Sequence, residues 1–163
     1  MTSTASEVIN QGSITSLSLV APIIDLRGGQ TVFLNEGNIF APFPETVVVA
    51  GGATDDVIAL LDGNVTGDVN TGNGSDSLLV TGGTLNGSLT MGSGSDNQAR
   101  VQKVSLAKTS HITAASGAGA TLSFSEIEAR GGSFVSDDLS KGTNLGAGWS
   151  TLNFSPLKVD IDR

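Results

Sequence analysis

Apolar residues along this chain occur in short runs that are separated by glycine-rich corners. The runs at residues 57–61 and 77–80, for example, are followed by turns at Gly63 and Gly83. Short apolar runs between turn residues are typical of β-strands, whereas an amphipathic helix would repeat its apolar positions every three to four residues. The pattern therefore predicts an all-β protein, and no segment shows a convincing helical period.

The strand and corner pattern repeats with a period of twenty residues in the middle of the chain. The segments GGATDDVIAL, TGNGSDSLLV and MGSGSDNQAR begin at residues 51, 71 and 91, and they place Asp56, Asp76 and Asp96 at equal intervals. A fixed period of this length indicates a repeat architecture, in which each repeat is one rung of a stack. At roughly 20 residues per rung, the chain would form a β-solenoid of about eight rungs.

The repeats divide one expected domain, residues 1–163, into three regions. Residues 1–43 are the least regular and are expected to form irregular rungs or a cap. Residues 44–103 hold the clearest repeats, and residues 104–163 are looser, since the glycine corner at 117–119 carries no aspartate and comes late. Extra residues of this kind are expected to form loops on one face of the solenoid.

Composition and charge narrow the function classes. Aromatic residues make up only 4% of the chain, which suits rungs filled by Val, Leu, Ile and Ala. The formal net charge of -8 argues against a nucleic-acid partner and an anionic membrane surface. There is no cysteine, hence no disulfide or thiolate metal site, and no stretch reaches the roughly eighteen apolar residues of a spanning helix. No signal peptide is visible, so an exported protein would have its targeting segment outside this sequence.

The glycine-rich string GNVTGDVNTGNGSDSLLVTGGTLNGSLTMGSGSD, with TLSFSEIEARGGSFVSDDLS and WSTLNFS after it, resembles the passenger region of bacterial autotransporters, the type V secreted surface proteins. The resemblance covers about residues 45–155. It implies a right-handed parallel β-helix on the exterior of the bacterial outer membrane, a non-enzymatic stalk or adhesin. A host-surface protein or glycan would be the partner, and a full-length protein would add further solenoid and a carboxy-terminal membrane barrel.

A calcium-binding site is an alternative interpretation of the glycine and aspartate corners. Residues 72–78 read Gly-x-Gly-x-Asp-x-Leu, which resembles the calcium-binding repeat of RTX β-rolls. Those rolls repeat every nine residues, whereas here one corner per rung carries the motif, so we expect turn-forming aspartates and no cofactor. The candidate calcium ligands are Asp55, Asp56, Asp76 and Asp96.

Catalysis is the third alternative, because parallel β-helices also include polysaccharide lyases and glycosidases. Glycoside hydrolysis needs two positioned carboxylates. Glu126 and Glu128 would share one strand face with Arg130, whereas the adjacent aspartates at 137–138 would point to opposite faces. His111 is the only histidine, which excludes a multi-histidine zinc site, and no nucleophile elbow is present. A solvated strand explains these residues as well, so we expect no enzyme.

Overall fold

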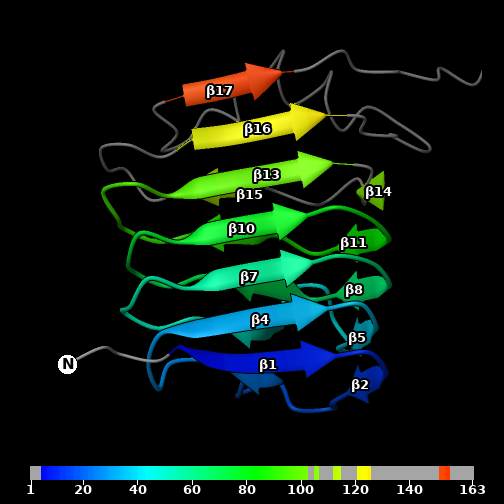
Figure 1. The fold of residues 1–163 in the computed structure, drawn as a ribbon. Coiled ribbons are helices and arrows are strands. Elements are labelled where there is room, and N and C mark those ends of the chain that lie inside the picture. The colour runs from blue at the N-terminus through cyan, green and yellow to red at the C-terminus, as the bar shows by residue number, and fades with distance from the viewer. Residues whose placement is uncertain (1–4, 103–104, 107–111, 115–120, 126–150, 155–163) are drawn as a thin grey trace, which may run out of the picture.

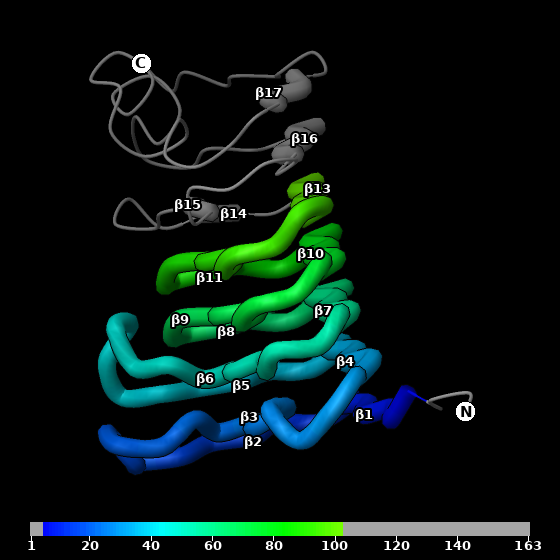
Figure 2. The backbone as a smooth tube through the Cα atoms, turned by 90° about the vertical axis from the view of Figure 1, so that its left-hand side faces the viewer, coloured from blue at the N-terminus to red at the C-terminus, as the bar shows by residue number. Residues whose placement is uncertain are grey.

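The protein is a right-handed β-solenoid whose walls are three parallel sheets (Figures 1 and 2). The computed structural model describes residues 5–102, 105–106, 112–114, 121–125 and 151–154. In Figure 1 the chain runs from left to right along β1 (Ser6–Asn10) and turns at the right through β2 (Ser13–Thr15). It returns behind the first sheet through β3 (Ile24–Asp25) and then rises to β4 (Thr31–Asn35), which lies above β1. No helix among the described residues is long and apolar enough to span a bilayer. The all-β solenoid prediction is confirmed.

From β1 to β15, each turn contributes one strand to each sheet. The first sheet has the order β1-β4-β7-β10-β13-β16-β17, the second β14-β11-β8-β5-β2 and the third β15-β12-β9-β6-β3. The remaining strands are β5 (Asn38–Phe40), β6 (Val47–Ala50), β7 (Val57–Leu60), β8 (Asn64–Thr66), β9 (Asp68–Asn70), β10 (Ser77–Val80), β11 (Thr84–Asn86), β12 (Leu89–Met91), β13 (Gln98–Gln102), β14 (Ser105–Leu106), β15 (Ile112–Ala114), β16 (Thr121–Ser125) and β17 (Thr151–Phe154).

Aliphatic side chains stack in columns inside the solenoid. Because the strands pair in parallel register, equivalent positions of successive turns lie one above another. Side chains alternate between the two faces of a strand, so the same alternate positions always point inward. The inward columns include Phe33, Ile58 and Leu78 of the first sheet, Ile39, Val65 and Leu85 of the second, and Val49, Val69 and Leu89 of the third, all at most 3% exposed.

The expectation of about eight rungs was wrong, because rung length is not constant. Residues 5–102 form about four turns, and β13 to β17 continue the sheets. In the first sheet Ser6 pairs with Thr31 and Val32 with Val57, a spacing of 25 residues. The spacing of 20 holds where Val57 pairs with Ser77, and it lengthens again toward β17.

The extra residues of the first two turns lie in the links between the second and third sheets. These links span residues 16–23 and 41–46, whereas Gly67 alone joins β8 to β9. The two long links project from the same side of the solenoid (Figure 2). Residues 5–43 form β1 to β5, so the stretch with the weakest sequence repeat stacks in the same way as the rest.

The tight corners require glycine. Gly83 has φ of 69°, in the left-handed region, and a Cβ atom there would overlap the backbone of Gly63 in the turn below. We therefore expect Gly83→Ala to lower the free energy of unfolding by at least about 2 kcal/mol, through backbone strain and steric overlap.

Urea denaturation of Gly83→Ala and Gly28→Ala measures this effect. Gly28 has no atom within 4 Å of a built Cβ, so it is the matched control and should change stability by less than about 0.5 kcal/mol. Equal losses of unfolding free energy in both variants would contradict the inference that the stacked corner at Gly83 requires glycine.

Candidate functional site

Two of the aspartates singled out by the sequence repeat, Asp56 and Asp76, are buried at the corner that precedes the first sheet. Each is 1% exposed. The main-chain N–H of Thr31 donates to Asp56 Oδ1 at 2.8 Å, and the N–H of Asp56 donates to Asp76 Oδ1 at 2.9 Å. Each carboxylate therefore accepts a hydrogen bond from the main chain of the preceding turn.

The second carboxylate oxygens close the corners of their own turns. Gly52 N–H donates to Asp56 Oδ2 at 3.2 Å, and the Thr71 hydroxyl donates to Asp76 Oδ2 at 2.7 Å. All four carboxylate oxygens thus have protein donors. This geometry supports the interpretation of these aspartates as turn formers.

The third member of the series is Asn97, and the structure corrects the equal spacing that pointed to Asp96. Gln98 pairs with Ser77, a spacing of 21 residues, which moves the corner position by one. Asp76 N–H donates to Asn97 Oδ1 at 2.8 Å, and Asn97 Nδ2 donates to the Gly92 carbonyl at 2.7 Å. Asp96 is exposed. We call Asp56, Asp76 and Asn97 the corner ladder.

Burial changes the titration of Asp76. It raises the pKa of Asp76 to about 6, the hydrogen bonds from Thr71 and from the Asp56 amide oppose the rise, and the nearby charges of Asp56 and Asp55 add to it. The folded-state pKa lies above the unfolded value of about 3.9, so folding favours the protonated acid. This contribution to stability is complete below about pH 4 and is lost as the pH rises through about 6.

We expect Asp76→Asn to remove this part of the pH dependence, because an amide can accept the same hydrogen bond without a charge, as Asn97 does. Relative to the parent protein, the variant should gain on the order of 2–3 kcal/mol between pH 4 and pH 8. Chemical denaturation across that range measures it. Asp96→Asn removes the same charge from an exposed side chain and is the control. Identical pH profiles for the two variants would refute the burial argument.

The remaining calcium candidates, Asp55 and Asp96, are both exposed. Asp55 Oδ1 accepts a hydrogen bond from Ser75 N–H at 2.8 Å, and Asp96 Oδ1 accepts one from Gln98 Nε2 at 3.2 Å. Within the described ranges no group of three or more His, Cys, Asp or Glu side chains gathers as a metal site would require. The expected absence of a cofactor stays a prediction, with calcium as its alternative, and melting curves with and without millimolar calcium test it.

The candidate catalytic residues lie outside the described residues. These are Glu126, Glu128, Arg130, the aspartates at 137–138, and His111.

A second buried polar pair, Asn10 and Asn35, was missed by sequence reasoning. Asn10 Nδ2 donates to Asn35 Oδ1 at 2.7 Å, and Asn35 Nδ2 donates to the Gly37 carbonyl at 2.8 Å. These side chains close the corner between the first and second sheets in the first two turns. The signal was an Asn-x-Gly motif at residues 10–12 and 35–37, which the longer period of these turns concealed.

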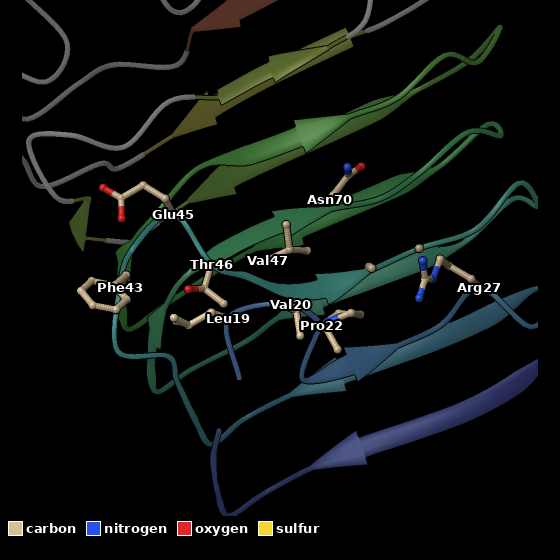
Figure 3. A pocket seen from close by; sticks show the side chains of 12 residues that line it. Leu19, Val20, Pro22, Arg27, Phe43, Glu45, Thr46, Val47 and Asn70 are labelled. Carbon is tan, nitrogen blue, oxygen red and sulfur yellow. The ribbon is translucent and has the colours of Figure 1, made fainter. Parts of the chain in front are cut away.

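The two long links and the third sheet enclose a groove of about 460 Å³, and Figure 3 shows its lining. Its apolar side chains are strongly exposed: Val20 is 96%, Leu19 62% and Phe43 54% exposed. The groove is lined by Leu19, Val20, Ala21, Pro22, Arg27, Phe43, Glu45, Thr46, Val47, Ala50, Gly51 and Asn70.

Charged groups stand at opposite ends of this groove. Figure 3 shows Glu45 beside Phe43 at one end and Arg27 at the other. Arg27 Nε donates to Asp25 Oδ1 at 2.7 Å, and this hydrogen bond lowers the pKa of Asp25 to about 2. Exposed apolar groups with a few fixed polar groups are typical of binding sites. The groove can therefore receive a ligand with an apolar body and polar ends.

No protein-family model matches the chain, and no curated protein or solved structure matches it either. The class of protein is defined by its own geometry: three parallel sheets, in-register columns and corner hydrogen bonds make it a β-solenoid.

Proposed function

We propose that the protein is a non-enzymatic surface module, a segment of an autotransporter passenger that serves as stalk and adhesin outside the bacterial outer membrane. The groove between residues 16–23 and 41–46 is its binding surface. The partner is a protein or glycan of a host surface. The resemblance of the repeats to autotransporter passengers supports the location, and the groove supports the binding role.

The observation that carries this proposal is that the two long links between the second and third sheets, residues 16–23 and 41–46, stack on one side of the solenoid. Elsewhere in residues 5–102 the second and third sheets are joined by links as short as Gly67 alone. Leu19, Val20 and Phe43 on the long links expose apolar surface to water, and this exposed surface does not stabilise the core. Loops on a rigid scaffold are where binding residues concentrate, and insertions in solenoids commonly form the binding face.

The test is binding of the purified chain to a panel of extracellular-matrix proteins and cell-surface glycans by biolayer interferometry. We expect at least one member of the panel to bind. The double variant Leu19→Ser with Phe43→Ser should weaken that binding at least about tenfold, because two exposed apolar contacts are removed.

Phe40→Ser is the matched control. Phe40 is also exposed, at 47%, but it does not line the groove. The control should bind as the parent chain does. Absence of binding across the panel, or equal losses in the control and the groove variant, would argue against an adhesive groove.

A further inference from the structure

The outer face of the first sheet is mostly apolar over its first four strands, where Glu7 and Ser77 are the polar outward residues. In these strands the inward positions hold the core, and the parallel register aligns the outward positions in two rows. The side chain of Ile9 is 54% exposed and that of Val57 38% exposed. The outward apolar residues are Ile9, Val32, Leu34, Val57, Ala59 and Leu79.

This face differs from the outer face of the second sheet. Apart from Phe40, the equivalent positions there are polar: Asn64 Nδ2 donates to Asn38 Oδ1, and the Thr84 hydroxyl donates to Asn64 Oδ1. Figure 1 looks directly onto the first sheet, and no part of the chain that the structure describes covers it. An aliphatic sheet face of this kind is typical of a surface that packs against another sheet.

Opposite charges stand at the two ends of the apolar rows. Glu7 lies on β1, two residues before Ile9, and Arg100 lies on β13 in register with Leu79. Both are exposed. Among residues 5–102 the ion pair is Arg27 with Asp25, so neither Glu7 nor Arg100 forms one there. The middle strand between them is β7.

We propose that a second copy of this chain packs on the outer face of the first sheet, with the two solenoid axes antiparallel. The two-fold axis runs along β7. This rotation lays β1 over β13 and β4 over β10 of the partner, so Glu7 comes within reach of the partner's Arg100, and the symmetric contact repeats the pair. Leu34 then packs against the partner's Leu79, and Val57 against the partner's Val57.

The charges select this arrangement. With parallel axes, β1 would lie over the partner's β1 and β13 over the partner's β13, so the two Glu7 carboxylates would gather at one end of the interface and the two Arg100 guanidinium groups at the other. The antiparallel arrangement pairs opposite charges at both ends and keeps the aliphatic rows in contact, with the sheets about 10 Å apart. The inference is independent of the groove and of its ligand.

The contact is small, so the dimer is a reversible one. Five strands at about 4.8 Å spacing and about 16 Å length give roughly 350–400 Å² per copy. Stable complexes bury about 800 Å² per partner. We therefore expect a monomer–dimer equilibrium with a dissociation constant in the micromolar to submillimolar range.

Sedimentation equilibrium from about 10 µM to about 1 mM protein tests the proposal. The parent chain should pass from monomer to dimer within this range. Val57→Lys places two lysines against each other on the axis and should raise the dissociation constant at least about 100-fold. Phe40→Lys adds the same charge to an exposed position of the second sheet and should dimerise as the parent chain does.

Charge reversal provides the specific readout. Glu7→Arg and Arg100→Glu should each raise the dissociation constant about tenfold, and the double reversal should return it to within about threefold of the parent value. Circular dichroism checks that every variant keeps the parent fold. A chain that stays monomeric at about 1 mM, a dimer that survives Val57→Lys, or a double reversal that gives no recovery would each overturn the proposal.

Discussion

Main-chain amides buried at the corner before the first sheet impose the constraint on which the rest of the solenoid depends. At this corner the chain passes from the third sheet to the first, and the corner is buried away from water. An amide left there without an acceptor would cost about 1–3 kcal/mol. Asp56, Asp76 and Asn97 supply the acceptors, each to the turn that precedes it. Among the described residues, no buried side-chain polar atom lacks a hydrogen-bond partner.

These side-chain acceptors couple neighbouring turns as well as satisfying amides. Because the acceptor on one turn serves the amide of another, the corner ladder fixes which residues of successive turns lie above each other. The aliphatic columns then stack without offsets, and their burial supplies the main favourable term in folding. The ladder also makes the free energy of unfolding depend on pH, because the carboxyl group of Asp76 is more costly to bury when it is charged.

The scaffold and the proposed binding surface are separable in this design. Where Gly67 joins β8 to β9, a Cβ atom would overlap the Val48 side chain, so the corner stays minimal. Residues 16–23 and 41–46 also connect the second sheet to the third, and because these links are longer they project from the sheets and line the groove. The columns beneath continue unchanged, because the links meet the sheets at the same inward positions, such as Val49 above Ile24. A stiff stack can therefore vary its links without losing its core.

The sequence predicted the fold class because strand period and turn chemistry are local properties. Rung number was predicted wrongly because it depends on the links, whose lengths change the spacing from 25 to 20 and then to 21 residues. The same change placed Asn97 where the repeat suggested Asp96. The groove was not foreseen, since Val20 and Phe43 lie far apart in sequence and only the stacking of two turns brings their links together. Handedness followed from the family resemblance, and the structure agrees with it.

The register at the corner ladder is the most direct test of this account, and the absence of cysteine makes disulfide mapping clean. With a spacing of 21 residues, Ser77 and Gln98 are neighbours on β10 and β13. We expect the double variant Ser77→Cys with Gln98→Cys to form a disulfide on mild oxidation, because paired positions on adjacent strands lie within the Cα distance of about 4.4–6.8 Å that a disulfide spans. Ser77→Cys with Asn97→Cys should stay reduced. Efficient cross-linking of the second pair and not the first would show a spacing of 20 residues, and it would contradict the corner ladder.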